Sequence, residues 1–208
     1  MRLRIKIRML PYEISTRVKN YILVRKYPWL KLITWNEEEE EVRDPHYDYR
    51  YTALFDNMPG WWKAFGRLFC DEIQEHYKEC PNMYILETKE KYGQLRITMA
   101  NANKAVNDIC GKCEFISQNV CYFCGRPHTF MTDTGWILPI CPECYDRERW
   151  GMKPYSEAIC EEDNRIPYTY QIHHTNKDND WYEDIDISKT VIKIEENYDK
   201  HRRSIWRF

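Results

Sequence analysis

The sequence predicts an α+β fold, in which a small mixed domain of helices and antiparallel sheets is followed by a cysteine-rich insert and a β-rich C-terminal appendage. Alternating apolar residues predict strands, apolar residues three and four apart predict amphipathic helices, and two Cys-x-x-Cys pairs stand 16 residues apart. These patterns divide the chain into an α+β domain over residues 1–120, a ribbon over 121–145 and a C-terminal appendage over 146–208.

The composition fits a folded protein without a membrane span. The 208 residues are 43% hydrophobic and 15% aromatic, which is ample for a core, and no stretch approaches 18 consecutive apolar residues. The first eight residues alternate charged and apolar types and contain no continuous apolar block of the signal-peptide kind. Together with nine cysteines, an odd number, this predicts a protein of the reducing cytoplasm.

The N-terminal alternation predicts a half-buried strand over residues 2–9, with a basic outer face. The basic face consists of Arg2, Arg4, Lys6 and Arg8. Two interpretations are open. The charges keep the edge of a sheet from pairing with other chains, or they form a strip that contacts phosphate groups. A second strand is predicted over residues 29–35.

Helices and a hairpin are predicted to complete the first domain. Apolar spacing indicates three helices, over residues 11–26, 59–79 and 101–120. Residues 83–100 have the pattern of a hairpin whose turn is formed by residues 91–94. Basic side chains gather near this turn and are candidate binding residues, namely Lys89, Lys91 and Arg96.

The strongest motif in the chain is the pair of Cys-x-x-Cys turns. Each pair has the short spacing that places two thiolates on one metal ion. Four sulfur ligands favour tetrahedral Zn²⁺, so we predict one structural zinc per chain, with Gly125 supplying a positive φ and Trp136 packing on the site. The predicted ligands are Cys121, Cys124, Cys141 and Cys144. Such a site has no open coordination position, so it stabilises structure and does not activate water.

A third Cys-x-x-Cys pair, Cys110 and Cys113, lies within the helix predicted over residues 101–120. The same spacing occurs in metal and redox sites. Cys113 falls on the apolar stripe of this helix, however, so a buried structural position is the favoured interpretation.

The C-terminal appendage is also predicted from alternation. Residues 166–173 alternate apolar and polar types, and Ile185 with Ile187 and Ile192 with Ile194 indicate one or two further strands. We expect these strands to form a small sheet with the N-terminal strand beside it.

Several of these pieces together resemble a family of small zinc-ribbon proteins encoded in bacteriophages and prophages. The resemblance covers roughly residues 50–145 and rests on Gly60-Trp61 before an aromatic helix, on Lys89-Glu90-Lys91-Tyr92-Gly93-Gln94-Leu95-Arg96, and on Cys121-x-x-Cys124-Gly with Gly135-Trp136 and Cys141-x-x-Cys144. It implies an accessory protein of an infected bacterial cytoplasm, with a structural zinc. Accessory proteins of this class often bind host machinery such as restriction or CRISPR systems. The Cys110 and Cys113 pair and the C-terminal tail depart from the family pattern.

The sequence favours a non-enzymatic binding protein. It has no Gly-rich phosphate loop, Ser/His/Asp triad or metalloprotease motif, whereas its basic ends and many aromatic residues are typical of binding surfaces. The predicted partner is a host protein or ribonucleoprotein complex. Direct binding of nucleic acid is an alternative, which the sequence pI of about 6.3 disfavours. An HNH-like nuclease using His173 and His174 is a weaker alternative, because adjacent residues of a strand point to opposite faces. A purely structural role in an assembly is also open.

Overall fold

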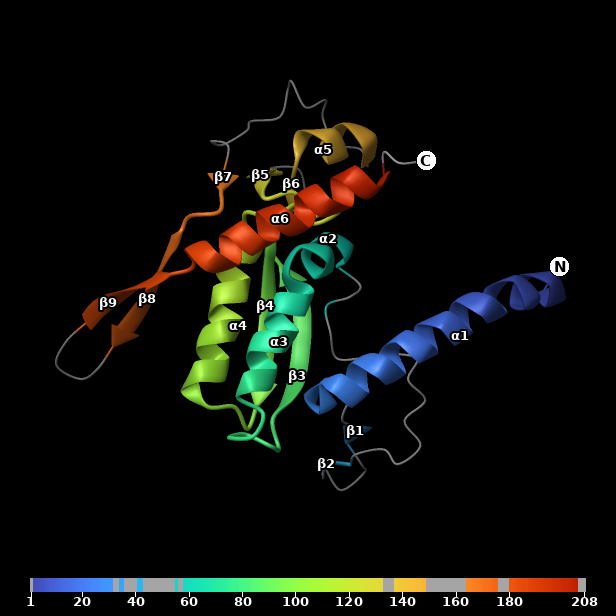
Figure 1. Ribbon diagram of the computed structural model, residues 1–208, viewed down its shortest axis with the longest axis horizontal. Coiled ribbons are helices and arrows are strands. Elements are labelled where there is room, and N and C mark those ends of the chain that lie inside the picture. The colour runs from blue at the N-terminus through green and yellow to red at the C-terminus, as the bar shows by residue number, and fades with distance from the viewer. Residues whose placement is uncertain are drawn as a thin grey trace.

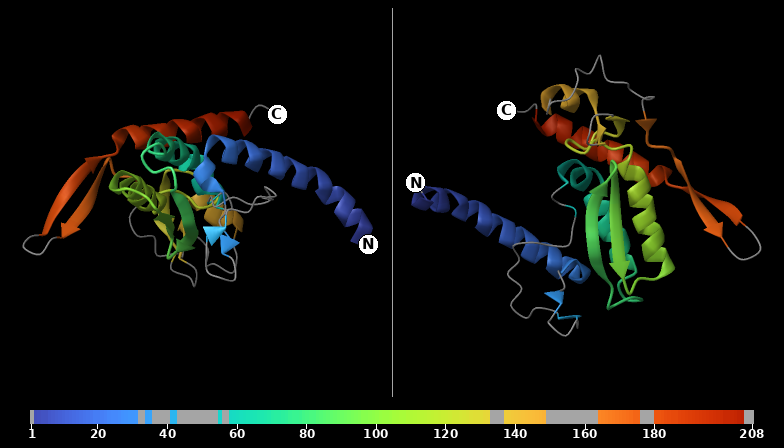
Figure 2. Two further views of the ribbon diagram at one scale, coloured as in Figure 1. Left: turned by 90° about the horizontal axis from the view of Figure 1, so that it is seen from below. Right: turned by 180° about the vertical axis from the view of Figure 1, so that it is seen from behind.

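The computed structural model describes residues 2–31, 34–35, 41–42, 55, 58–132, 137–148, 164–175 and 180–205. Two helices packed on a β-hairpin form the body, with a ribbon at one end and a C-terminal helix lying across it (Figure 1). The N-terminal helix and a second hairpin project from opposite sides of this body, as the further views also show (Figure 2). The α+β class predicted from the sequence is confirmed.

The central hairpin consists of β3 (Tyr84–Lys91) and β4 (Gln94–Ala100), which pair antiparallel. Tyr92 and Gly93 form the turn, with φ angles of 53° and 77°. Glycine adopts this left-handed conformation without a steric penalty, which is why the turn forms at this point of the sequence. The hairpin predicted over residues 83–100 and its turn are confirmed.

Helix α4 (Lys104–Ser117) lies along β4 and supplies hydrogen bonds to it. The Ser117 Oγ accepts from the backbone N–H of Leu95 at 2.9 Å, and the Glu114 Oε1 accepts from that of Ile97 at 2.8 Å. Strand N–H groups that point away from β3 are therefore satisfied by side chains of the helix.

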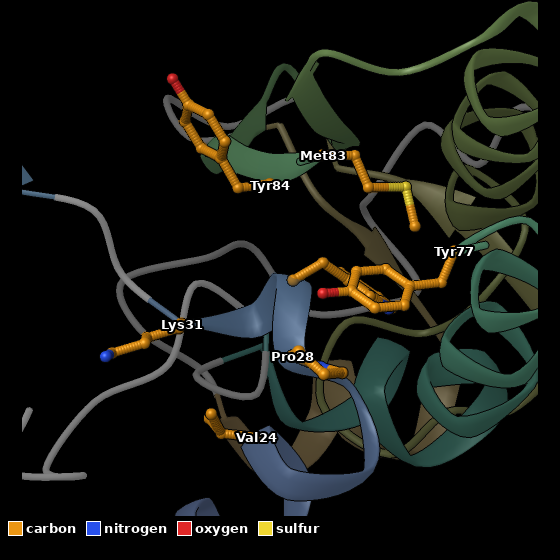
Figure 3. Close-up of a pocket in the computed structure, with 7 residues that line it drawn as sticks. Val24, Pro28, Lys31, Tyr77, Met83 and Tyr84 are labelled. Atoms are coloured by element: carbon orange, nitrogen blue, oxygen red, sulfur yellow. The ribbon is translucent and has the colours of Figure 1, made fainter. Parts of the chain in front are cut away.

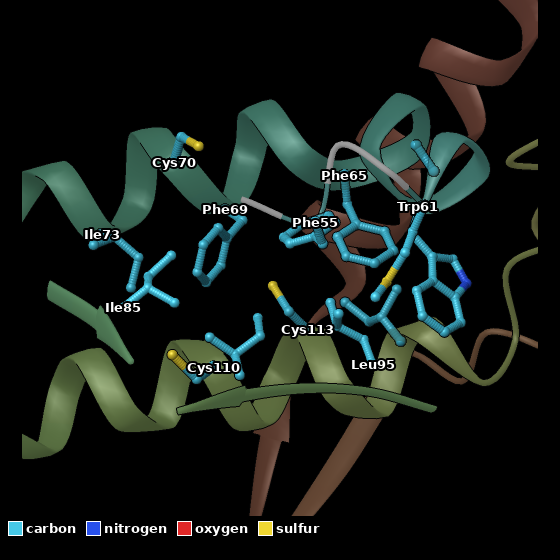
Figure 4. Close-up of a cluster of buried hydrophobic side chains, with 14 of the residues drawn as sticks. Phe55, Trp61, Phe65, Phe69, Cys70, Ile73, Ile85, Leu95, Cys110 and Cys113 are labelled. Carbon is cyan, nitrogen blue, oxygen red and sulfur yellow. The ribbon is translucent and has the colours of Figure 1, made fainter. Parts of the chain in front are cut away.

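The main hydrophobic core lies between this hairpin, α4 and a second helical stretch (Figure 4). That stretch runs without a break through α2 (Pro59–Trp61), the π-helical segment η2 (Trp62–Gly66) and α3 (Arg67–Glu75). Fully buried side chains of the core include Phe55, Trp61, Phe65, Phe69, Ile73, Leu95, Val106 and Ile116. The helices predicted over 59–79 and 101–120 are confirmed, with shorter bounds.

The strand predicted over residues 2–9 is wrong, because these residues begin helix α1 (Arg2–Lys26). Their apolar positions fit both an alternating and a three-and-four spacing, and Arg, Lys, Leu and Met are good helix formers. A one-sided basic strip was predicted from this strand, and the side chains of its residues lie outside the described part of the chain. That strip comprised Arg2, Arg4, Lys6 and Arg8. The helix predicted over 11–26 is present, and it includes Pro11, which lacks an N–H to donate.

The chain then makes a 3₁₀ turn, η1 (Pro28–Leu30), before two short strands. These are β1 (Thr34–Trp35) and β2 (Glu41–Val42), which pair antiparallel. The strand predicted over residues 29–35 is therefore correct only at its end. The fixed φ of proline suits the first position of the 3₁₀ turn, which buries Trp29 in the core.

A three-stranded antiparallel sheet joins the ribbon to the C-terminal part of the chain. Its order is β6 (Pro139–Ile140), β5 (His128–Met131) and β7 (Asn164–Arg165). A short helix, α5 (Pro142–Glu148), follows β6. The C-terminal segment therefore pairs with the ribbon and not with the N-terminal segment, contrary to the prediction.

The projecting hairpin consists of β8 (Thr169–Thr175) and β9 (Asp180–Asp186). These strands confirm the one predicted over residues 166–173 and the one expected to follow it. The base of the hairpin packs on α4, where the rings of Tyr170 and Phe115 are 5.1 Å apart.

The strand predicted at Ile192 and Ile194 is wrong, because both residues lie in helix α6 (Ser188–Ile205). Val191 and Ile194, three residues apart, are buried in the main core, so the helical period is the one that removes apolar surface from water. The C-terminal segment is thus a hairpin followed by a long helix, and not rich in strands throughout. Within the described ranges, α1 and α6 included, no helix has the length and apolar character needed to cross a bilayer.

Candidate metal centre

Four cysteine sulfur atoms converge between the two Cys-x-x-Cys turns. They belong to the predicted ligands Cys121, Cys124, Cys141 and Cys144, and all lie within 4.8 Å of one another. The sulfurs of Cys124 and Cys141 are 3.6 Å apart. Four sulfurs at about 2.3 Å from one tetrahedral ion are about 3.8 Å from each other, so the cluster fits a single ion. Three of the cysteines are buried and Cys124 is partly exposed.

The first pair of sulfurs is positioned by a tight backbone turn. The N–H of Gly125 donates to the carbonyl of Cys121 at 2.9 Å, and the N–H of Cys121 donates to the carbonyl of Arg126 at 2.9 Å. Gly125 has a φ of 80°, which an L-residue with a Cβ rarely adopts. The knuckle turn predicted from Gly125 is confirmed.

The second pair lies where β6 passes into α5. Cys141 immediately precedes the helix, Cys144 is in its first turn, and the N–H of Tyr145 donates to the carbonyl of Cys141 at 2.9 Å. Tyr145 is buried with its ring 5.5 Å from that of Phe130 in β5. A small apolar cluster thus supports the second pair from within the ribbon.

The first knuckle packs directly on the start of the α2 helix. The N–H of Gly60 donates to the carbonyl of Tyr122 at 2.8 Å. A Cβ at Gly60 would lie 2.1 Å from the carbonyl oxygen of Cys121, and a Cβ at Gly125 would lie 2.7 Å from the carbonyl oxygen of Gly60. The two backbones therefore approach so closely that only glycine fits on either side.

Trp61 fixes the same contact from the core side. Its indole Nε1 donates to the carbonyl of Val120 at 2.9 Å, and its ring lies edge-on to that of Tyr122 at 5.2 Å. Trp61 is fully buried, and this hydrogen bond satisfies its indole N–H, which would otherwise be buried without an acceptor. The four-cysteine cluster and the main core are thus one packed unit.

The tip of the central hairpin also contacts the ribbon. A Cβ at Gly93 would lie 2.2 Å from the methyl carbon of Met131 in β5. The N–H of Tyr122 donates to the carbonyl of Pro139 at 2.8 Å, which holds the first knuckle to β6. The glycines at positions 60, 93 and 125 therefore mark the surfaces at which helix, hairpin and ribbon meet.

A charged group joins the ribbon to α6. The guanidinium of Arg126 donates through Nε to the Tyr198 hydroxyl at 3.1 Å and through Nη2 to the Glu143 carboxylate at 2.7 Å. Arg126 follows the first knuckle, Glu143 lies between the second pair of cysteines, and Tyr198 is on α6. This contact could not be predicted from the sequence, because nothing in the local pattern relates Arg126 to a residue 72 positions away.

The gathering of four sulfurs changes their acidity. The pKa of Cys121 is lowered far below that of a free thiol, because Cys124, Cys141 and Cys144 donate hydrogen bonds to its sulfur. The pKa of Cys144 is raised, because its thiol is hydrogen-bonded to that same sulfur. The protons that remain on the thiols compete with a metal cation for the sulfur atoms. Because fewer protons are bound at higher pH, metal affinity rises with pH.

The third Cys-x-x-Cys pair does not form a second centre. Cys110 and Cys113 are buried in the main core on α4, as the sequence analysis favoured (Figure 4). Burial raises the pKa of Cys110 to about 12 and that of Cys113 well above its usual value. In the part of the chain that the structure describes, the ribbon cysteines alone form a group suited to a metal ion.

The predicted binding residues of the hairpin lie together on its exposed face. Lys89 is directly opposite Arg96 in the β3–β4 pairing, and Lys91 is two residues further along the same face. Lys89 Nζ is 2.6 Å from the Glu87 carboxylate, and Arg96 Nη1 is 3.2 Å from the Glu114 carboxylate. Two of the three charges are therefore paired within the fold, which reduces the positive potential of this face.

Several other predicted residues lie outside what the structure describes. Trp136 is among them, as are the side chains of the basic residues of α1, Arg2, Arg4, Lys6 and Arg8. The backbone of His173 and His174 is in strand β8, as expected, opposite Tyr182 and Trp181. Their side chains are outside the described part.

One small pocket lies where the end of α1, the turn after α3 and the start of β3 meet (Figure 3). Its volume is about 170 Å³, and its lining residues are Val24, Pro28, Trp29, Lys31, Tyr77, Met83 and Tyr84. Ordinary ligand pockets measure about 300 Å³ or more. The lining includes no cysteine, histidine or carboxylate.

Comparison with known proteins gives no relative for this chain. No protein-family model, curated protein or solved structure matches it. The resemblance to phage zinc-ribbon proteins therefore stays a prediction from the motifs.

Proposed function

We propose that this protein is a non-enzymatic binding protein whose ribbon is held by one structural Zn²⁺. The observation that carries the proposal is the donor set, since the metal-ligating group found among the described residues consists of four cysteines. Soft sulfur donors in a tetrahedral arrangement favour Zn²⁺ over hard cations, and four thiolates fill its coordination shell. A filled shell leaves no position for a substrate or a water molecule, so the ion would contribute stability and not Lewis-acid chemistry.

The contacts of the centre support a structural role. Gly60 and Trp61 join the first knuckle to the helical core, and Arg126 joins both knuckles to Tyr198 of α6. A metal ion here would therefore stabilise more than the ribbon, because α2 and α6 are both hydrogen-bonded to residues at the first knuckle.

We further propose that the partner is a host protein in an infected bacterial cytoplasm, of the nucleic-acid-handling kind found in restriction or CRISPR systems. The biological setting is inferred from the resemblance of the motifs to phage zinc-ribbon proteins. The pairing of Lys89 and Arg96 with carboxylates favours a protein partner over nucleic acid, because few free cations are left on that face for phosphate groups.

Metal analysis and binding assays test these proposals. We expect inductively coupled plasma mass spectrometry to find one zinc per chain. The zinc-loaded protein should bind purified restriction or CRISPR effector complexes and inhibit their cleavage of DNA. Micromolar binding to generic duplex DNA that weakens steeply with salt, and that Lys89→Glu with Lys91→Glu abolishes, would replace the protein partner with nucleic acid.

A nuclease activity is the competing function. It would appear as cleavage of DNA or RNA in the presence of Mg²⁺ or Mn²⁺, and the variant His173→Ala/His174→Ala would lose it. We expect no cleavage by either protein. Metal-dependent cleavage that the double substitution removes would overturn the binding-protein proposal.

A further inference from the structure

Helix α1 carries an apolar face that the body of the protein does not cover. Ile14, Val18, Tyr21 and Ile22 are 55%, 52%, 42% and 60% exposed. At 3.6 residues per turn, these positions fall within an arc of about 100° on one side of the helix. An arc of this width is what a surface helix normally turns toward a core. Here it faces away from the body, which leaves large apolar side chains in water.

The orientation of this face is fixed by the opposite side of α1. Asn20, Leu23 and Val24 are 1%, 5% and 8% exposed and pack on the body, and Lys19 Nζ stands 5.7 Å from the ring centroid of Trp62. The helix is thus anchored by its C-terminal half, while its N-terminal half projects away from the body in every view (Figure 2). We call the exposed residues Ile14, Val18, Tyr21 and Ile22 the α1 stripe.

The same apolar spacing recurs in the sequence before Ile14. Leu3, Ile7 and Leu10 precede Ile14 at spacings of four, three and four. From Leu3 to Ile14, leucine and isoleucine thus alternate in the d and a positions of a heptad, a pattern typical of helices that pair with one other helix. The backbone of α1 from residue 3 to residue 22 is about 30 Å long at a rise of 1.5 Å per residue.

Charge selects the kind of helix that fits. Residues 1–31 contain nine Lys and Arg residues and one acid, Glu13. A second copy of α1 placed on the stripe would bring like charges together along its whole length, which destabilises helix pairs. A partner helix with Asp and Glu beside its apolar seam would instead meet opposite charges.

The α1 stripe is less suited to an anionic membrane or to nucleic acid. Helices that lie on membranes commonly present Trp and Phe beside Leu on their apolar side, whereas residues 3–22 of α1 contain neither Trp nor Phe. Nucleic acid offers phosphates to the basic residues but no apolar groove for a row of aliphatic side chains.

We propose that the α1 stripe is a docking surface for an acidic amphipathic helix of a partner protein. This inference rests on the proposed binding function and names the surface and the chemistry of the partner. The partner helix would cover the apolar side chains, and its carboxylates would pair with the flanking Arg and Lys residues of α1.

Binding of designed peptides to the full-length, zinc-loaded protein tests the proposal. The probe is a synthetic peptide of about four heptads with Ile and Leu at its a and d positions and Glu at its e and g positions. The matched control peptide carries Gln in place of each Glu. We expect the Glu peptide to bind at least about tenfold more tightly at low salt, and this difference to shrink as salt screens the charges.

Surface variants locate the binding. Ile14→Ser/Val18→Ser should weaken the Glu peptide by about tenfold or more, because it removes two exposed side chains that the complex buries. Ile192→Ser is the matched control, since it replaces an isoleucine of α6 that is 47% exposed. Arg17→Glu should also weaken binding, and its control is Lys193→Glu on the exposed surface of α6. All four variants should keep the zinc content and melting temperature of the wild type.

Several results would overturn the proposal. These are binding that the α1 substitutions leave unchanged, equal affinity for both peptides, or no binding of the Glu peptide at all. A dimer on sizing chromatography that Ile14→Ser/Val18→Ser dissociates would assign the stripe to a second copy. Binding to vesicles of anionic phospholipid, in place of the peptide, would assign it to a membrane. In each case a protein with one zinc that still inhibits a host complex would leave the proposed function standing.

Discussion

The chain uses one cysteine spacing in two regions, with opposite results. At Cys121 and Cys124 the spacing lies in a tight turn that ends at a glycine with positive φ, and two sulfurs meet a second pair. At Cys110 and Cys113 the same spacing lies inside α4, where both side chains are buried among apolar residues. The backbone that carries the cysteines therefore decides whether their sulfurs converge on an ion or fill a core.

The pKa values of the cysteines also differ between the ribbon and α4. In the ribbon, hydrogen bonds from neighbouring thiols lower the pKa of Cys121. In the helix, loss of solvent raises the pKa of Cys110 to about 12, and the carboxylate of Glu114 adds to the shift. Only the thiolate binds metal or attacks a disulfide, so the helical pair is inert near neutral pH.

The largest effect should come from removing one ribbon sulfur. Cys121→Ser or Cys144→Ser should abolish zinc binding and unfold the ribbon, since structural zinc contributes on the order of 10 kcal/mol to small modules. Metal analysis and hydrogen exchange would follow the loss. A variant that retains one zinc and protects the ribbon amides as the wild type does would contradict a four-sulfur site.

A smaller loss should follow from widening the contact between knuckle and helix. Gly60→Ala would place a Cβ 2.1 Å from the carbonyl oxygen of Cys121, and because that atom belongs to the backbone it has little room to move. We expect destabilisation of about 2–4 kcal/mol, measured by urea unfolding. Gly125→Ala should act similarly, with added strain from its φ of 80°.

Gly111→Ala in α4 is the matched control for these two variants. Its Cβ would meet the hydroxyl of Tyr170 at 2.8 Å, which is the end of a side chain that can shift. Alanine also favours a helix interior by about 1 kcal/mol, so we expect a net change within about 1 kcal/mol. Equal losses for Gly111→Ala and Gly60→Ala would show that the knuckle contact is not special.

Replacing the helical cysteines should cost little and leave the metal in place. Cys110→Ala and Cys113→Ala should each lower stability by about 1–2 kcal/mol through lost packing, with zinc still at one per chain. Loss of zinc in either variant would instead mean that the two regions share a function.

The buried thiol of Cys110 makes the folding stability depend on pH. Cys110 keeps its proton up to about pH 12 in the folded protein, whereas in the unfolded chain it ionises near pH 9. Its contribution to folding stability is therefore complete below about pH 9 and is lost as the pH rises toward 12. Iodoacetamide at pH 9 should leave Cys110 unlabelled in the folded protein and label it after denaturation, as peptide mass spectrometry would show. Rapid labelling in the folded state would contradict its burial.

The smallest effect should come from the contact between the ribbon and α6. Tyr198→Phe removes the hydroxyl that accepts from Arg126 Nε and should lower stability by about 1 kcal/mol, measured by thermal unfolding. Tyr168→Phe, at a tyrosine that is 55% exposed, is the control and should change stability by less than about 0.5 kcal/mol. An equal loss of stability in Tyr168→Phe would contradict a stabilising hydrogen bond between Arg126 of the ribbon and Tyr198 of α6.

The parts that sequence could predict are those with local signals. The ribbon ligands follow from two spacings of three residues, and the hairpin over residues 83–100 follows from alternation around Gly93, which needs positive φ. The ends of the chain fail for an equally local reason. Residues 2–9 and the segment around Ile192 both fit a strand period and a helix period. Around Ile192, the burial of Val191 and Ile194 in the folded protein decides for the helix.

The contacts that surround the candidate site could not be predicted, because they join residues far apart in the chain. Gly60 has the pattern of a helix start, and nothing nearby shows that the knuckle at Cys121 and Tyr122 will lie on it. Arg126 and Tyr198 likewise have no shared pattern. The α1 stripe was visible as helical spacing, but its exposure required knowledge of which face the body covers.

X-ray absorption spectroscopy at the zinc edge tests the central claim most directly, because it reports the atoms bound to the ion. We predict a single shell of four sulfur atoms at about 2.3 Å, unchanged in Cys110→Ala and Cys113→Ala. A shell that contains nitrogen or oxygen, from histidine, carboxylate or water, would contradict a closed site and reopen the case for metal-dependent chemistry.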